Sequence, residues 1–473
     1  MSKDDKIYNI KDYERDPVGE DIDIFMDWDE RDLSDELVDI GKKNPGVDKP
    51  MLVITLVILL IGIIMVLSAS FARGFYTQSD PLRLFSRQFV FAVSGIALMF
   101  ITSRLSVRTI SRWSMQLLIV SMALLVLVLI IGIRVNGAKR WIGIGGENSS
   151  LTFQPSEIAK LALILSFAQM TCKLGKERMK TFKYGIIPFA AITLVMIVLL
   201  RMEPHLSAII IVTGLAAIMM FAGGTRLRWF IMAVVILIAM ISGFIFFQLR
   251  GNVSEADMRN APVETVRTNL DLSGLGYEGR RITAWLNPDA DPLRDGFQIR
   301  QSLNAVGSGG LLGLGLGQSR QKHLYLPEEH NDYIFAIVCE ELGFIGAMLI
   351  LMLFVLLIIR GYWLAIHASD KFSSLITIGI TSLLAIQVFL NVAVVTNMLP
   401  ATGISLPFFS YGGTALWINW FKSELFLRYR EKYRYQMKRV KKHDFSDCLR
   451  RLRRAHKSCT RYCRAANKRN TRS

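Results

Sequence analysis

Apolar stretches long enough to cross a lipid bilayer recur along this chain, and they constrain its fold more than any other feature. The sequence of 473 residues is 52% hydrophobic, with a mean hydropathy of +0.35. A segment that crosses roughly 30 Å of hydrocarbon has to satisfy its own backbone hydrogen bonds, so such stretches are expected to be helices. Ten are predicted, at residues 51–71, 88–105, 113–133, 156–172, 184–201, 205–223, 228–248, 333–360, 373–397 and 408–427.

The predicted fold class is therefore an all-α integral membrane protein, a multi-pass bundle of ten transmembrane helices. An even number of spans places both termini on one side, and the lysines and arginines of the connecting segments gather there, which marks that side as the cytoplasm. The other side carries one large extracytoplasmic loop, at residues 249–332.

Charge divides the chain into three parts. Residues 1–49 carry a net charge of −8 and are predicted to form a disordered cytoplasmic tail, residues 50–427 form the membrane domain, and residues 428–473 form a cytoplasmic tail with a net charge of +15. A basic tail beside a membrane is expected to contact anionic membrane lipids. No nucleic-acid recognition motif accompanies it, so no nucleic-acid partner is predicted.

Several cations are expected on the outer side, against the usual bias. Arg73 lies between the first two spans, and Lys139 and Arg140 lie between the third and the fourth. A polyanionic ligand such as a phosphate or pyrophosphate would explain them, because the planar arginine fork bonds phosphate oxygens in pairs. The alternative is that these side chains reach toward lipid phosphates.

Charged residues also fall inside predicted helices. Glu157 and Lys160 open the fourth span and share a helix face, either as a structural ion pair or as the wall of an internal polar cavity. Glu340 and Glu341 lie two turns into the eighth span and cannot both face lipid. An ion pair with an arginine is the structural interpretation for them.

Asp332 lies where the eighth predicted helix begins, after a stretch rich in ionisable residues that starts at Arg320. An aspartate in this position can cap the helix N-terminus. It can also act as a base, because the positive end of the helix favours the ionised carboxylate.

Three segments resemble the SEDS family, which contains FtsW, RodA and SpoVE. The first is Asn-Gly-Ala-Lys-Arg-Trp-Ile-Gly at 136–143, with Phe-Gln-Pro-Ser-Glu-Ile-Ala-Lys at 153–160. The second runs from Trp-Leu-Asn-Pro at 285–288 through Ser-Arg-Gln-Lys at 319–322 to His-Asn-Asp-Tyr-Ile-Phe at 330–335. The third is Pro-Ala-Thr-Gly-Ile-Ser-Leu-Pro-Phe-Phe-Ser-Tyr-Gly-Gly at 400–413. The form of residues 319–322 is closer to the FtsW/SpoVE branch than to RodA.

This resemblance implies a peptidoglycan glycosyltransferase that polymerises lipid II at the outer face of the bacterial cytoplasmic membrane. It implies a class B penicillin-binding protein as partner, together with other divisome proteins. The essential aspartate of the family falls on Asp332, which is expected to be the catalytic general base. The substrate-binding candidates are Arg140, Lys139, Arg73, Lys322, Arg320, Glu157, Lys160 and His330.

Two positions depart from the family pattern. Asn331 replaces a threonine in the His-Thr-Asp sequence, and His205 stands where many members have an aspartate. No metal-binding cluster is predicted, although a divalent cation could share the neutralisation of the pyrophosphate. The alternatives to an enzyme are a lipid II flippase or transporter and a scaffold for the penicillin-binding protein without catalytic activity.

Overall fold

The computed structural model describes most of the membrane domain and part of the large loop. The described residues are 48–77, 82–102, 107–135, 138–143, 152–232, 235, 277–288, 295–368 and 370–410. Both predicted tails lie outside these residues.

The described elements are mostly helices that follow the predicted apolar stretches. Before the large loop they are α2 (Lys49–Thr77), α3 (Arg83–Thr102), α4 (Val107–Ile131), α5 (Pro155–Met179), α6 (Phe182–Gly185), α7 (Ile187–Met202) and α8 (Leu206–Ala222). In and after that loop they are α12 (Tyr277–Leu286), α13 (Asp295–Ser308), α14 (Ile334–Ile366) and α15 (Lys371–Val395).

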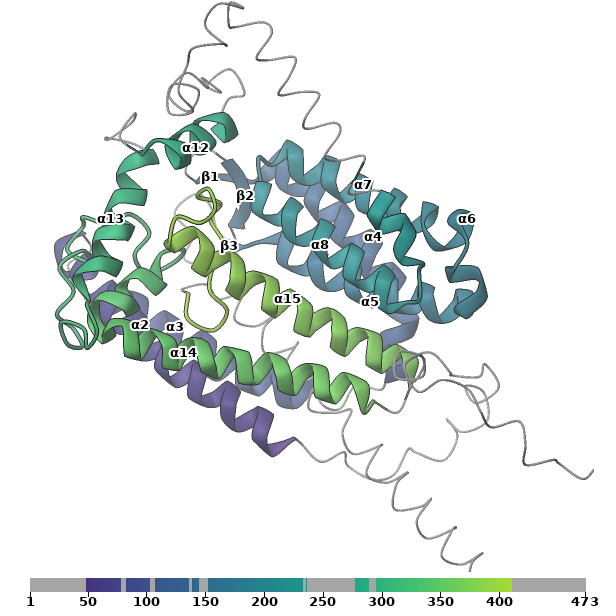
Figure 1. The fold of residues 1–473 in the computed structure, drawn as a ribbon, viewed down its shortest axis with the longest axis horizontal. Coiled ribbons are helices and arrows are strands. Elements are labelled where there is room, and N and C mark those ends of the chain that lie inside the picture. Colours follow the sequence, from purple (N-terminus) through teal and green to yellow (C-terminus); the bar gives the residue numbers. More distant parts are fainter. Residues whose placement is uncertain are drawn as a thin grey trace, which may run out of the picture.

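Helix α15 lies at the centre of the bundle, between two groups of helices (Figure 1). One group is α4, α5, α7 and α8, and the other is α2, α3 and α14. Among the long apolar helices that the structure describes, α5 and α15 are the most enclosed, with 67% of the residues in their most apolar stretch buried. Enclosure also allows α5 to be the most polar of these, because its polar groups face protein instead of lipid.

Six of the described helices are long and apolar enough to cross a membrane, and two shorter apolar helices accompany them. Together these eight coincide with eight of the ten predicted spans, which confirms a mostly helical membrane protein. The predicted spans at 228–248 and 408–427 lie mostly outside the described residues.

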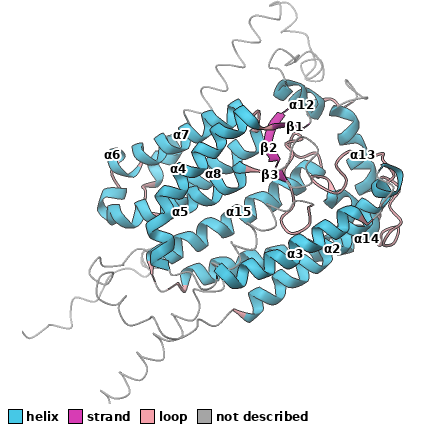
Figure 2. Cartoon of the chain, turned by 180° about the vertical axis from the view of Figure 1, so that it is seen from behind, coloured by secondary structure: helices cyan, strands magenta, loops and turns pink. Residues whose placement is uncertain are grey.

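A small antiparallel sheet makes the all-helical prediction incomplete. It consists of β1 (Ile133–Val135), β2 (Ala138–Gly143) and β3 (Thr152–Phe153), in that order across the sheet. The sheet follows α4 and precedes α5, at the same end of the bundle as α12 (Figure 2). Its strands are too short to show a clear alternating pattern, and this is why the apolar periodicity did not reveal them.

Helix α14 is broken at Gly343, where φ is +68°, and a glycine-rich loop repairs the break. At this point the carbonyls of Glu340 and Glu341 no longer accept from the amides four residues later. They accept instead from the amides of Leu314 (3.0 Å) and Gly315 (3.0 Å). The amides of Phe344 and Ile345 donate in turn to the carbonyls of Gly310 (2.9 Å) and Leu311 (3.1 Å).

This repair requires the two backbones to approach closely. A Cβ atom on Gly343 would lie 2.2 Å from the amide nitrogen of Gly313, and one on Gly313 would lie 2.2 Å from the carbonyl oxygen of Glu341. Only glycine fits at both positions, which also have positive φ angles. The glycine-rich segment 307–317 is therefore hydrogen-bonded to a membrane helix along its middle.

Replacing Gly343 with alanine should destabilise the fold by about 3 kcal/mol or more, because the new methyl group meets backbone atoms and the φ angle is unfavourable. Thermal unfolding in detergent measures this change. Gly307→Ala is the matched control, since a Cβ there has nothing within 4 Å. It should be neutral or slightly stabilising. Equal melting temperatures for the two variants would contradict the expected close packing.

Candidate active site

Asp332 is held at one end of the bundle by contacts to its main chain. The Asn391 amide on α15 donates to the carbonyl of Asp332 (2.8 Å) and to that of Ile404 (2.6 Å). Ser410 Oγ donates to the carbonyl of the preceding Asn331 (2.7 Å). One asparagine in a central helix thus holds the Asp332 segment against residues 401–410.

The capping interpretation of Asp332 is wrong. Helix α14 takes Tyr333 as its N-cap, and no side chain makes a capping hydrogen bond there. The carboxylate is instead next to Gly403, where a Cβ atom would lie 3.2 Å from Asp332 Oδ2 and φ is +69°. A glycine at this position lets the backbone approach the carboxylate without covering it with a side chain.

Burial raises the pKa of the half-buried Asp332 carboxyl to about 6, and the nearby Glu328 carboxylate raises it further. Arg281, Arg140 and His330 oppose this shift by favouring the ionised form. A carboxyl with this pKa is mostly ionised at neutral pH and is more basic than an ordinary aspartate. Both properties suit a general base.

Arg140 lies on β2 and reaches the connection between α7 and α8. Its guanidinium donates to the main-chain carbonyls of Glu203 (3.5 Å) and Pro204. The neighbouring Lys139 instead donates to the carbonyls of Leu129 (3.3 Å) and Ile130 (3.4 Å), close to the C-terminus of α4. Of these two predicted cations, Arg140 is the one within electrostatic reach of Asp332.

Glu203 and His205 are buried polar residues near Arg140. Glu203 is 1% exposed, and its carboxylate oxygens make no hydrogen bond within the described part of the chain. Burial raises the pKa of Glu203 to about 8, although Arg140 opposes the shift. Burial also lowers the pKa of His205 well below its usual value, and Arg140 and Lys160 lower it further. Both groups are therefore mostly neutral at pH 7.

The start of α8, just after His205, is hydrogen-bonded to the residues next to Gly403. Ser207, in the first turn of α8, donates from its hydroxyl to the carbonyl of Thr402, the residue before Gly403. His205, which departs from the family pattern, lies two residues before Ser207 and makes none of the hydrogen bonds described for the Asp332 segment.

Glu157 and Lys160 form a buried ion pair in the first turns of α5. The two side chains are 7% and 4% exposed, which agrees with both interpretations made from the sequence. Because Lys160 influences the pKa of His205, this pair lies beside the polar group on the α7–α8 connection.

Arg73 and His330 meet at the end of α2. The Arg73 guanidinium lies 3.2 Å from His330 Nδ1 and 3.8 Å from the carboxylate of the buried Glu329. These contacts place Arg73 beside His330, which lies two residues before Asp332 in the chain, so both predicted residues belong to the surroundings of the candidate site.

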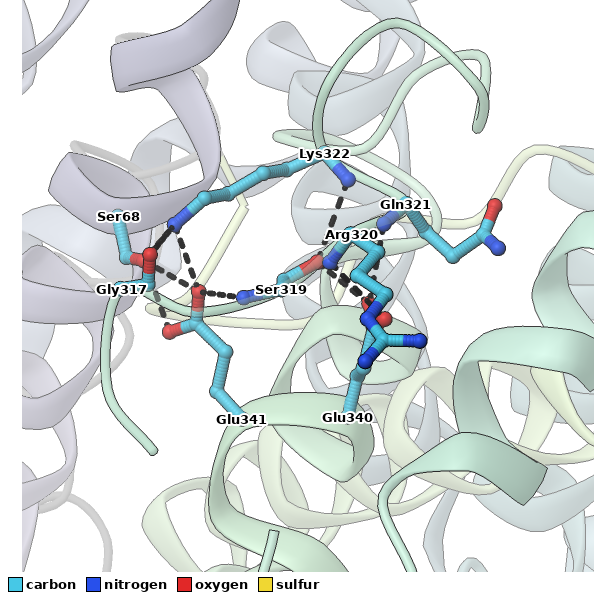
Figure 3. A network of polar contacts seen from close by, with 8 residues as sticks. All are labelled: Ser68, Gly317, Ser319, Arg320, Gln321, Lys322, Glu340 and Glu341. Atoms are coloured by element: carbon cyan, nitrogen blue, oxygen red, sulfur yellow. Dashed lines mark hydrogen bonds and ion pairs between the residues drawn. The ribbon is translucent and has the colours of Figure 1, made fainter. Parts of the chain in front are cut away.

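Lys322 lies in a different buried network, at the break in α14 (Figure 3). Its ammonium group donates to the Glu341 carboxylate (3.0 Å), to Ser68 Oγ on α2 (3.2 Å) and to the carbonyl of Gly317 (2.5 Å). The prediction that an arginine pairs with these two glutamates is therefore wrong, because Glu341 pairs with Lys322.

Glu340 in the same network accepts from the protein backbone. The amides of Arg320 (3.0 Å) and Gln321 (3.3 Å) donate to its carboxylate, together with the hydroxyl of Ser319. The Arg320 side chain itself is exposed. It is thus available to a ligand at the surface, whereas the Lys322 side chain is enclosed.

Three residues around Asp332 were not predicted from the sequence as site residues, namely Arg281, Asn391 and Gly403. Arg281 also donates to the carbonyl of Ala401 (2.8 Å) and so belongs to the same group of contacts. Asn391 gave a usable signal, because an amide in the middle of an apolar helix needs polar partners. The role of Gly403 depends on its φ angle, which no local pattern predicts.

No group of three histidine, cysteine, aspartate or glutamate side chains that could hold a metal ion occurs within the described ranges. The acidic residues near Asp332 are instead engaged with cations and amides. The divalent cation considered from the sequence therefore has no candidate ligand set in this part of the chain.

These features define a multi-pass membrane protein with a partly buried carboxylate at one end of its bundle. The family model described as "Cell cycle protein", which covers FtsW, RodA and SpoVE, matches residues 49–435, and the chain belongs to this family. The match spans all the membrane helices described above.

Relatives and solved structures agree with this assignment. Stage V sporulation protein E of Bacillus subtilis is 41% identical over 79% of this chain and 94% of its own length. The probable peptidoglycan glycosyltransferase FtsW of Geobacter metallireducens is 36% identical, over 79% and 92% respectively.

Two solved structures share the fold. A chain in "Structural coordination of polymerization and crosslinking by a peptidoglycan synthase complex" superimposes with a TM-score of 0.62 at 26% identity, covering 82% of this chain and 98% of that one. The rod shape determining protein RodA of Thermus thermophilus gives a TM-score of 0.54 at 25% identity, covering 80% and 95%.

Lys322→Met should destabilise the protein by about 3–5 kcal/mol, because it leaves the Glu341 carboxylate buried without its cation. The double variant Lys322→Met/Glu341→Gln should recover much of this loss, and thermal unfolding of both variants measures it. If Lys322 acts only in the network, glycan synthesis should recover together with stability. A stable but inactive double variant would instead assign Lys322 to the substrate.

Proposed function

We propose that this protein is a peptidoglycan glycosyltransferase that polymerises lipid II, with Asp332 as its general base. The enzyme class follows from its family and from relatives that carry this name. The residue assignment rests on one observation. Asp332 is a half-buried carboxylate at one end of the bundle. Its pKa is raised to about 6, and arginines lie within electrostatic reach.

In the proposed reaction, the hydroxyl at C4 of an acceptor N-acetylglucosamine attacks the anomeric carbon of a donor N-acetylmuramic acid. Asp332 takes the proton of that hydroxyl as the new C–O bond forms. The bond between the anomeric carbon and the pyrophosphate breaks on the opposite face, and undecaprenyl pyrophosphate leaves with the electron pair. The configuration at the anomeric carbon is inverted.

Cations near Asp332 would stabilise the leaving pyrophosphate, whose charge grows in the transition state. Arg140 is the first candidate, because it influences Asp332 and is fixed by two main-chain carbonyls. Arg281 is added to the predicted set on the same electrostatic ground. Arg73, held by Glu329 and His330, and the exposed Arg320 are further candidates. Lys139 and Lys322 have the weaker claim, since their ammonium groups are bound within the protein.

The reaction would take place on the outer face of the bacterial cytoplasmic membrane, with ten spans and both termini in the cytoplasm. The elements that carry Asp332 and Arg140 lie at one end of the bundle, which agrees with this topology (Figure 1). A class B penicillin-binding protein is the proposed partner. The similarity to a chain of a peptidoglycan synthase complex supports this choice.

Asp332→Asn should remove almost all glycan polymerisation, because loss of a general base typically costs about 10²–10⁴-fold in rate. The same variant should unfold at an equal or higher temperature, since burial disfavours the charged carboxylate that it replaces. Purified protein, lipid II and a polymer gel measure the activity, and a thermal scan measures the stability.

Glu177→Gln on the exposed α5–α6 region provides the control and should keep full activity. Near-normal polymer from Asp332→Asn would reject the assignment. Movement of labelled lipid II between leaflets without polymer formation in the unmodified protein would favour the flippase. If the unmodified protein neither polymerises lipid II nor moves it between leaflets, but still binds the penicillin-binding protein, the scaffold would be favoured.

The pH dependence of activity should follow the Asp332 carboxyl. Since a base works in its ionised form, kcat/KM should fall about tenfold per pH unit below pH 6 and level off above pH 7. Glu328→Gln removes a neighbouring charge that raises this pKa, so its acidic limb should move to lower pH. Rates measured from pH 4.5 to 8 test both statements, and an unshifted limb in Glu328→Gln would contradict the assignment.

A further inference from the structure

Two polar layers mark the thickness of the membrane on this protein. At one end, Asp48 caps α2 and pairs with Arg360 on α14 (2.9 Å). At the other end, Ser68 on α2 donates to the carboxylate of Glu341 on α14 (2.6 Å).

The spacing of these layers is nearly the same along both helices. Twenty positions separate Asp48 from Ser68, and nineteen separate Glu341 from Arg360. At about 1.5 Å per residue this is about 30 Å, the thickness of a hydrocarbon core. The glutamate network of Figure 3 therefore lies at the edge of the hydrocarbon.

The glycine-rich loop that repairs α14 lies at this same level. Its residues 310–315 pair with the backbone of residues 340–345, so the loop is fixed beside the edge of the hydrocarbon. Irregular backbone is tolerated at such a depth only when protein groups satisfy it, and the broken α14 supplies those groups.

Several large apolar side chains of this loop are exposed. Leu311, Leu312 and Leu316 are 69%, 80% and 54% exposed. They continue the exposed apolar surface of α14, where Phe344 is 60% exposed and Leu349 is 57% exposed. This surface belongs to a helix that spans the membrane, so the leucines extend a lipid-facing surface.

Aromatic residues accompany the leucines. Tyr76 at the end of α2 and Tyr325 after the loop are both 58% exposed, and the Tyr76 ring lies 6.0 Å from that of His323. Tyrosines typically gather at the level of the lipid headgroups, because their rings are apolar and their hydroxyls are polar. Tyr76 lies eight positions beyond Ser68 in α2, so it is on the headgroup side of this polar layer.

We propose that the loop Gly309–Gly317 is inserted into the bilayer, where Leu311, Leu312 and Leu316 contact lipid acyl chains just inside the headgroups. The occupant of this surface is lipid. The Glu340/Glu341 network holds the loop on its protein-facing side. The inference depends on the membrane-spanning fold and not on the proposed glycosyltransferase activity.

A nitroxide spin label tests this placement. Leu312→Cys is introduced into the full chain, with the five native cysteines replaced, and the protein is placed in vesicles of phosphatidylethanolamine and phosphatidylglycerol. Collisions of the label with oxygen, which concentrates in lipid, are compared with collisions with a water-soluble nickel chelate. Val355→Cys on the exposed face of α14 is the lipid reference, and the exposed Arg300→Cys on α13 is the water reference.

The oxygen-to-nickel ratio at position 312 should resemble that at 355 and exceed that at 300 severalfold. Leu316→Cys should behave in the same way, and it provides a second measurement if Leu312→Cys does not fold. A ratio at both positions equal to that at 300 would overturn the proposal. So would protection of the labels that appears only when another protein is added, since the surface would then dock a protein.

Discussion

The fold depends on satisfying the polar groups that the membrane bundle encloses where helix α14 is broken. Helix α14 shows how far this requirement extends, because its backbone is broken at Gly343 and four main-chain hydrogen bonds to a loop replace those that are lost. The carboxylates next to the break are satisfied by Lys322, Ser68 and backbone amides. A break that would otherwise cost several kcal/mol thus becomes the attachment point of the large loop.

In the candidate site, by contrast, the negative charge of the Asp332 carboxylate is only partly balanced by nearby cations. Glu341 is fully paired, whereas Asp332 is half-buried beside Glu328, with its cations acting at a distance. Burial and like charge make the carboxyl more basic, and Arg281 and Arg140 keep it ionised at neutral pH. Burial and Glu328 therefore raise the pKa, and the two arginines, which main-chain carbonyls hold in place, limit the increase.

Hydropathy predicted most of the fold, because a spanning helix has to be apolar over about 20 residues wherever it faces lipid. The position of Asp332 also followed from its place before an apolar helix and from the family resemblance. The pairing of Lys322 with Glu341 and Ser68 did not, since it joins residues 254 positions apart in the chain. Likewise, the sheet at residues 133–153 and the glycine contact at Gly343 depend on tertiary packing that no local pattern contains.

Helix α15 separates the two groups of helices that meet at the site. Asp332 leads into α14 on one side, and Arg140 lies on a strand packed against α4 and α5 on the other. The base and this cation are consequently carried by different halves of the molecule. A small rotation of one half about α15 would change the distance between Asp332 and Arg140. The hydrogen bonds within each half would stay intact.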